Sequence, residues 1–184
     1  MIPKMNLIVW TLVLCVLIYE PVTGACPSGC YCRRSTSCNG TYVSCGGKGL
    51  TEVPTNIPTD TCFLNLRWNE ITTLGDNAFD GLTNIETLDL RGNQITTVGD
   101  KAFGGLSKLE TLWLSSNKIT TIQNNTFNGL QNLKILWLHS NNISVIQSNA
   151  FHGLPNLQTL NLWGNEITEL GNNIFHGLTK LQTL

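Results

Sequence analysis

From Thr61 onward, apolar and polar residues recur in the same order every 24 positions. Three residue types step through the chain together: Asn69, Asn93, Asn117, Asn141 and Asn165; Phe79, Phe103, Phe127, Phe151 and Phe175; Gly81, Gly105, Gly129, Gly153 and Gly177. The period gives five complete units, 61–84, 85–108, 109–132, 133–156 and 157–180, and the start of a sixth at 181–184. A strict period of this length predicts a solenoid, in which each unit is one coil that buries its apolar side against the next coil.

The start of each unit alternates between leucine and variable residues. In the third unit, for example, Leu112 and Leu114 flank Trp113. Alternation with a period of two predicts a short strand, whose leucines point into the solenoid while the residues between them point outward. We expect strands of successive units to pair in parallel, about 4.8 Å apart.

The repeated asparagine and phenylalanine have predicted structural roles. The asparagine stands where the chain turns after the strand, and its amide can satisfy a buried backbone donor and a buried acceptor together. Repetition in every unit predicts a buried polar ladder. The phenylalanines are expected to stack as a second ladder on the opposite side of each coil.

The complete unit reads L-x-x-L-x-L-x-x-N-x-I-[TS]-x-[LVI]-x4-F-x-G-L-x-x. This pattern resembles the leucine-rich repeat family in its extracellular form, and the resemblance covers residues 61–184. It implies a leucine-rich repeat solenoid, the α/β-type horseshoe. Such a fold has a curved parallel β-sheet on its concave face and loops with short helical turns on its convex face.

The N-terminal segment Met1–Gly24 reads as a signal peptide. Lys4 precedes an apolar run at 7–18, and small residues follow at 22–24, which is the order of an export signal. The alternative is a membrane anchor, but twelve apolar residues are too few to span about 30 Å of hydrocarbon as a helix. No later stretch is apolar enough to span a membrane.

Because the chain stops inside a strand at Leu184 without a cap, we expect it to be a fragment. Membrane attachment would then require a missing C-terminal part.

Residues 25–60 read as a cysteine-rich N-terminal cap, which the first coil needs because it has no preceding neighbour. Six cysteines follow the signal: Cys26, Cys30, Cys32, Cys38, Cys45 and Cys62. An even number in an exported chain predicts three disulfides, although the sequence alone leaves their pairing open. No metal site is expected, since the spacing is not that of a zinc ribbon and the histidines lie far away in the sequence.

The resemblance extends to this cap and implies the pairs Cys26–Cys32 and Cys30–Cys45. Cys38 and Cys62 depart from the family's four-cysteine cap. We propose that they form a third bridge, which ties an inserted loop at 33–41 to the first strand.

Composition and motifs exclude several classes of function. The chain has 11 basic and 12 acidic residues, and so lacks the basic surface that nucleic-acid binding needs. His139 and Ser140 are the only candidate catalytic pair on the concave face, and adjacent strand residues are expected to face apart. Without a nearby carboxylate, a phosphate loop or a metal-ligand cluster, we expect neither an enzyme nor a cofactor.

The outward strand positions are where a ligand would bind. They contain all four tryptophans that follow the signal, and the candidate ligand-binding residues are Arg67, Trp68, Asp89, Arg91, Trp113, Trp137, His139 and Trp163. Trp113 and Trp137 occupy equivalent positions and are expected to touch. They favour a protein-binding hot spot, a cross-strand pair that steadies the sheet, or a platform on which carbohydrate stacks. Arg67, Asp89 and Arg91 form either a charged cluster that tunes specificity or solvated surface pairs.

Three sequons predict glycosylation at Asn39, Asn124 and Asn142.

Together these features predict a secreted or cell-surface recognition module that binds an extracellular protein through its concave face. The cap and repeats resemble those of the variable lymphocyte receptors of jawless vertebrates, Slit and the Toll-like receptors. That resemblance implies roles in immune recognition or adhesion. The alternative is a structural extracellular-matrix protein of the small proteoglycan type, although the acidic Ser-Gly attachment run of that type is missing from this sequence.

Overall fold

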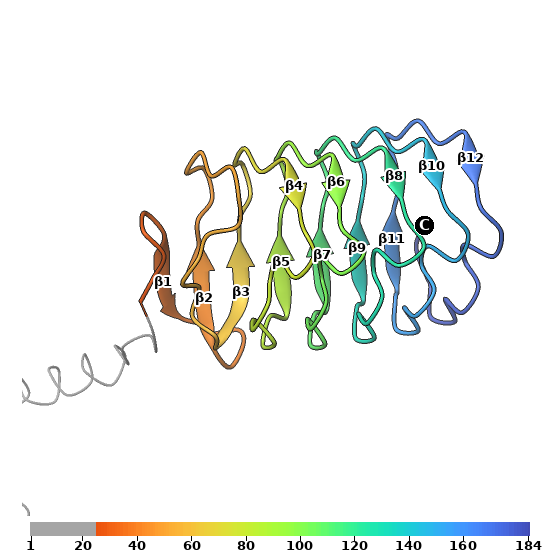
Figure 1. The fold of residues 1–184 in the computed structure, drawn as a ribbon. Helices are drawn as coiled ribbons and strands as arrows, with labels where there is room; N and C mark the ends of the chain where they lie inside the picture. Colours follow the sequence, from red (N-terminus) through yellow and green to blue (C-terminus); the bar gives the residue numbers. More distant parts are fainter. Residues whose placement is uncertain (1–24) are drawn as a thin grey trace, which may run out of the picture.

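Residues 25–184 form a curved solenoid of stacked coils (Figure 1). The structure is a computed structural model and describes these residues, so the predicted signal peptide lies outside them. The described part of the chain is built from strands and turns and contains no helix. It accordingly offers no helix long and apolar enough to cross a membrane.

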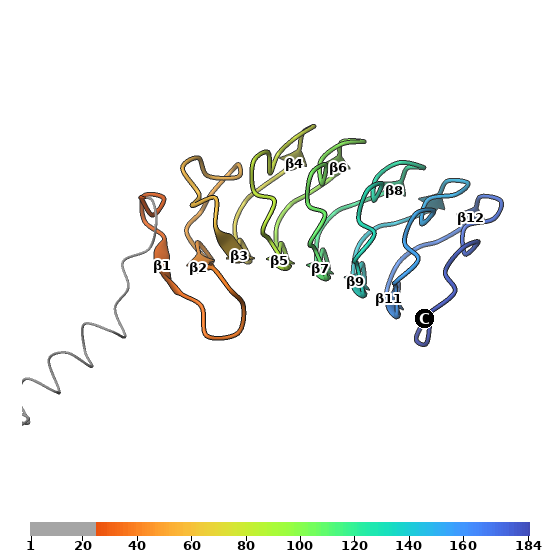
Figure 2. The same ribbon diagram turned by 90° about the horizontal axis from the view of Figure 1, so that it is seen from below.

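The largest sheet has seven strands in the order β1-β2-β3-β5-β7-β9-β11. Their bounds are Tyr31–Arg34 (β1), Thr41–Ser44 (β2), Thr61–Asn65 (β3), Thr87–Asp89 (β5), Thr111–Trp113 (β7), Ile135–Trp137 (β9) and Thr159–Asn161 (β11). The β1–β2 pair is antiparallel and every other pair is parallel. Figure 2 shows this sheet along the inner side of the bend, which makes it the concave face.

The convex side carries two smaller sheets of two-residue strands. They contain β4 (Thr73–Leu74) with β6 (Thr97–Val98), and β8 (Thr121–Ile122) with β10 (Val145–Ile146) and β12 (Glu169–Leu170). The short helical turns expected here are single turns, closed by bonds such as Ala102 N–H to the Gly99 carbonyl at 3.0 Å. None of these turns extends into a helix among the described residues, because the chain reverses direction again after each.

The core is built from equivalent residues of successive coils. The parallel register places Leu88 beside Leu112 and Leu112 beside Leu136, and all three are fully buried. The phenylalanine ladder is confirmed: Phe79, Phe103, Phe127 and Phe151 stack with centroids 6.0–6.1 Å apart. In the last described coil, Leu170 and Phe175 are exposed. The equivalent residues of the earlier coils are buried, because the next coil stacks against them.

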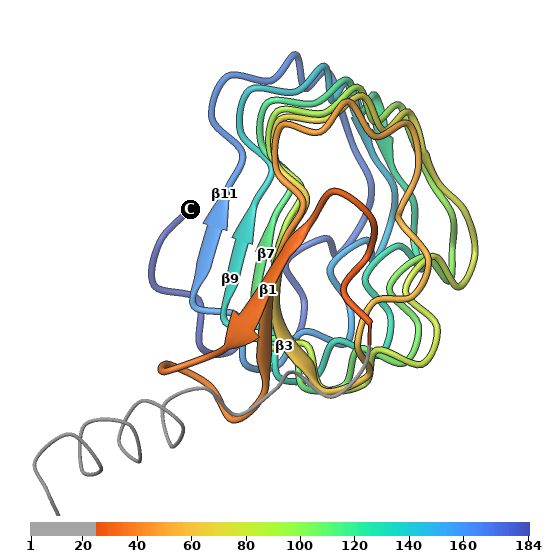
Figure 3. The same cartoon turned by 90° about the vertical axis from the view of Figure 1, so that its left-hand side faces the viewer.

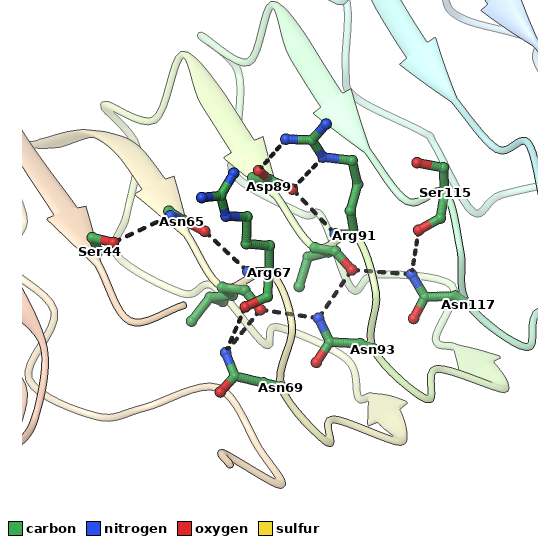
Figure 4. A network of polar contacts seen from close by, with 11 residues as sticks. Ser44, Asn65, Arg67, Asn69, Asp89, Arg91, Asn93, Ser115 and Asn117 are labelled. Atoms are coloured by element: carbon green, nitrogen blue, oxygen red, sulfur yellow. Dashed lines mark hydrogen bonds and ion pairs between the residues drawn. The ribbon is translucent and has the colours of Figure 1, made fainter. Parts of the chain in front are cut away.

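The asparagine ladder also forms as the sequence predicts (Figure 4). Asn117 donates from Nδ2 to the carbonyls of Leu90 and Leu114, both at 3.0 Å, and its Oδ1 accepts the Ile95 N–H at 3.1 Å. Asn93 makes the same three contacts one coil earlier. Each amide thus joins its own coil to the preceding one and satisfies backbone groups that the strands leave without partners.

The cap closes the first coil, as the view from that end shows (Figure 3). Its β2 strand pairs in parallel with β3, so the cap extends the concave sheet. Three disulfides hold it in place, joining Cys26 to Cys32, Cys30 to Cys45, and Cys38 to Cys62. The last of these links the loop between β1 and β2 directly to β3.

Candidate binding surface

The concave face presents its outward side chains in rows, because the parallel strands are paired in register. One row contains Asp89, Trp113 and Trp137, which are direct cross-strand neighbours on β5, β7 and β9. Two positions further along the chain, just past the ends of these strands, lie Arg91, Ser115 and His139. Residues distant in sequence are thereby brought side by side.

An aromatic stripe crosses this face from the cap to the fourth coil, and it consists of Tyr42, Phe63, Trp113, Trp137 and His139. Ring centroids lie 4.9 Å apart for Tyr42 and Phe63, and 6.5 Å apart for Phe63 and Trp113. Trp113 and Trp137 are in contact as predicted, at 5.5 Å, and the His139 ring lies 5.8 Å from Trp137. These spacings are those of favourable aromatic pairs.

Sequence reasoning assigned no role to Tyr42 or Phe63 in this stripe. The repeat pattern places Phe63 at an outward position of the first unit, and Tyr42 lies in the cap, outside the repeats. In the structure, buried Thr41 and Val43 alternate with less buried Tyr42 and Ser44, which places Tyr42 on the outward side of β2.

Arg91 is fixed between a carboxylate and the indoles. Its Nε donates to Asp89 Oδ1 at 2.9 Å and one terminal nitrogen donates to Oδ2 at 2.7 Å. The guanidinium carbon lies 4.5 Å from the Trp113 ring centroid and 5.9 Å from that of Trp137, within the range of cation–π attraction. Hydrogen bonding to Asp89 raises the pKa of Arg91 despite partial burial. The arginine is therefore a charged and oriented part of the surface.

This geometry corrects the expected charged cluster. Asp89 is only 2% exposed, so its pair with Arg91 is not a solvated surface pair. Arg67 is exposed and forms no ion pair within residues 25–184. The three residues therefore form one partly buried ion pair, between Asp89 and Arg91, and one separate cation, Arg67.

Trp68 occupies a backbone position that suits glycine better. Its φ is 56°, and the equivalent positions Gly92, Ser116, Ser140 and Gly164 are also left-handed. A bulky residue pays about 1–2 kcal/mol in this conformation. The side chain is nevertheless 63% exposed, and its ring lies directly over Gly92, where an added Cβ would overlap it.

A hollow of about 390 Å³ opens on the concave face between these groups. Its lining comprises Arg67, Trp68, Arg91, Ser115, Ser116, Trp137 and His139. Five of these are candidate binding residues from the sequence, and the structure adds Ser115 and Ser116. Trp163 stands apart from this lining and is 76% exposed.

The expected separation of His139 and Ser140 is wrong. His139 Nδ1 lies 3.2 Å from Ser140 Oγ. The left-handed backbone at Ser140, with φ of 56°, breaks the alternation of the strand and turns the hydroxyl toward the ring. Among the described residues, no carboxylate hydrogen-bonds to His139, so the orienting group of a catalytic triad is missing from this pair.

The three sequon asparagines are all exposed and lie off the concave sheet. Asn39 is in the loop between β1 and β2, Asn124 follows β8, and Asn142 precedes β10. Asn142 donates weakly to Glu166 Oε1 at 3.3 Å.

Comparison with known proteins gives a consistent result. The family described as BspA type leucine-rich repeat region matches residues 60–182 in six copies. The chain is 40% identical to leucine-rich repeat-containing protein 3B of Danio rerio over 85 residues, which cover 46% of the chain and 33% of that protein.

Two further relatives are biglycan and decorin. Biglycan of Xenopus laevis is 40% identical over 68 residues, covering 37% of the chain and 17% of biglycan. Decorin of Bos taurus is 38% identical over 69 residues, covering 38% of the chain and 18% of decorin. The matches thus span a third or less of the length of these relatives.

Proposed function

The chain belongs to the leucine-rich repeat family, and from that premise we propose that it is an extracellular recognition module whose concave face binds another protein. The aromatic stripe with Arg91 clamped across it carries this proposal. Tryptophan and arginine are the residues most enriched among interface hot spots, and contiguous exposed aromatic surface marks interaction sites. Because the sequence resembles receptors of this family, the proposed role is recognition in immunity or adhesion.

An extracellular location is supported by the chemistry of the cap. Three disulfides within one small cap are typical of proteins that fold in an oxidising compartment. The predicted signal peptide and the exposed sequon asparagines favour the same location. We propose glycans at Asn39, Asn124 and Asn142, all of which lie outside the strands of the concave sheet.

Binding is favoured over catalysis by the concave surface itself. In the hollow, Arg91 is held by two hydrogen bonds to Asp89, and His139 has a hydroxyl partner but no carboxylate partner in the described structure. A group that is oriented before binding lowers the ordering cost of association, which raises affinity.

The experiment uses the purified full-length chain, tetramerised and applied to an array of identified extracellular proteins. We expect Trp113→Ala combined with Trp137→Ala to lower the affinity for any bound protein about tenfold or more. Phe175→Ala is the matched control, because it removes an exposed aromatic ring from another face of the solenoid. Circular dichroism must remain native in both variants.

Two outcomes would contradict binding through the concave face. If no array protein is bound, or if the control weakens binding as much as the double variant, the concave face is not the binding surface. Binding to a glycan array that is lost only in the double variant would replace the protein ligand with carbohydrate.

A structural role in the extracellular matrix is the second candidate, favoured by the similarity to biglycan and decorin. It predicts that the chain stays in the detergent-insoluble matrix of cultured cells even when both stripe tryptophans are replaced. Recognition through the concave face predicts that the same substitutions release it.

A further inference from the structure

We propose that the hollow on the concave face binds a carboxylate side chain from an acidic segment of the partner protein, with Arg67 as its main ion-pairing group. This inference rests on the proposed function and specifies the chemistry of the partner. Three observations support it: the net positive charge of the residues that line the hollow, the guanidinium N–H groups that have no partner there, and the apolar side chains that surround these cations.

The lining of the hollow is cationic although the whole chain has a net charge of −1. It includes two guanidinium groups, from Arg67 and Arg91, and no carboxylate. The nearby Asp89 directs both oxygens to Arg91 and has a side chain only 3% exposed. Asp89 therefore neutralises Arg91 and leaves the charge of Arg67 uncompensated, so the hollow is complementary to an anion.

Both arginines retain hydrogen-bond donors for such an anion. A guanidinium has five N–H groups, and Arg91 uses two of them on Asp89. The side chain of Arg67 has no ion pair in the described part of the chain. The planar guanidinium of arginine can donate two parallel hydrogen bonds to a carboxylate, which favours this anion in the hollow.

The walls favour a peptide over a sulfated polysaccharide. Trp68 and Trp137 provide large apolar surfaces around the cations, and Ser115 and Ser116 leave room at the floor. A sulfated polymer is held by a track of many cations, whereas no lysine lines the hollow. Elsewhere, Lys134 pairs with Glu110, and Lys108 donates to Asn84. An acidic residue flanked by aromatic or apolar residues fits a compact cationic hollow with indole walls.

The test measures binding of a fluorescein-labelled peptide of four Glu-Tyr repeats to the full-length chain by fluorescence anisotropy. We expect saturable binding that weakens with added salt, and clearly weaker binding of the matched Gln-Tyr peptide. Arg67→Gln should lower affinity for the Glu-Tyr peptide about tenfold, and Arg67→Glu should lower it further. Lys101→Gln removes one exposed cation remote from the hollow and should leave affinity unchanged, with urea midpoints verifying the fold of each variant.

Three results would overturn the inference. They are equal affinity for the Glu-Tyr and Gln-Tyr peptides, equal loss in Arg67→Gln and Lys101→Gln, and preferential binding of a heparin dodecasaccharide through Arg67. Each is distinguishable from failure of the proposed function. Array binding that depends on Trp113 and Trp137 would then persist, and only the acidic character of the partner would be wrong.

Discussion

Replacement of Asn117 by alanine should lower the free energy of unfolding of the solenoid by about 4 kcal/mol. The value combines the loss of the hydrogen-bond partner of one buried backbone N–H with the loss of one hydrogen bond at each of two backbone carbonyls. The Ile95 N–H has Asn117 Oδ1 as its partner, and leaving a buried donor unpaired costs about 1–3 kcal/mol. The Leu90 and Leu114 carbonyls each lose one bond but keep the amide of an adjacent ladder asparagine. Each of those losses costs about 1 kcal/mol.

Two controls separate this mechanism from the general effect of losing an amide. Asn132 donates to the Ser107 carbonyl at 2.8 Å but is exposed, so Asn132→Ala should change stability by no more than about 0.5 kcal/mol. Asn165 makes the ladder contacts in a half-buried site. Because water can replace its amide there, Asn165→Ala should cost clearly less than Asn117→Ala.

The assay is urea unfolding of the full-length variants, followed by tryptophan fluorescence and circular dichroism. A lowered midpoint with an unchanged slope reports lost stability, and hydrogen exchange should show faster exchange at the Ile95 amide. The reasoning fails if Asn117→Ala is no less stable than Asn132→Ala, or if the Ile95 amide keeps its protection.

The remaining predictions concern the cap and the strained turn. Mass mapping of unreduced peptides should recover a peptide pair linked through Cys38 and Cys62, whereas a free thiol at either would contradict the third bridge. Gly92→Ala and Gly164→Ala should each cost about 1 kcal/mol, because both sites are left-handed. Only Gly92→Ala should also displace the Trp68 ring and change tryptophan fluorescence; identical spectra for the two variants would show that this ring does not rest on Gly92.

The core of the fold was predictable because its determinants recur at a fixed step in the sequence. Asn117 and Phe103 contact their own equivalents or the backbone of adjacent coils, so a period alone fixes their neighbours. The convex turns were less predictable. Whether successive turns merge into a helix depends on local hydrogen bonds, and the repeat pattern does not specify them.

The binding surface depends on contacts that the period does not encode. Phe63 on β3 meets Trp113 on β7 across the intervening strand β5, where Thr87 and Asp89 are short. Likewise, the position of Arg91 over the indoles follows from its pairing with Asp89. Such contacts require the register and side-chain directions of several strands together, and these become known only once the sheet is built.

The tryptophans of the concave face divide by burial into two groups with different expected roles. Trp113 is half-buried, and its indole nitrogen is the one buried side-chain polar atom without a hydrogen bond among residues 25–184. It contacts the Arg91 guanidinium, so its replacement would remove that contact as well as any ligand contact. Trp68 and Trp163 are mostly exposed, and Trp68 also occupies a backbone conformation unfavourable to a large side chain. The equivalent positions hold glycine at 92 and 164 and serine at 116 and 140, so the repeat does not require a large side chain at position 68. We therefore propose that the exposed indole of Trp68 contacts the ligand.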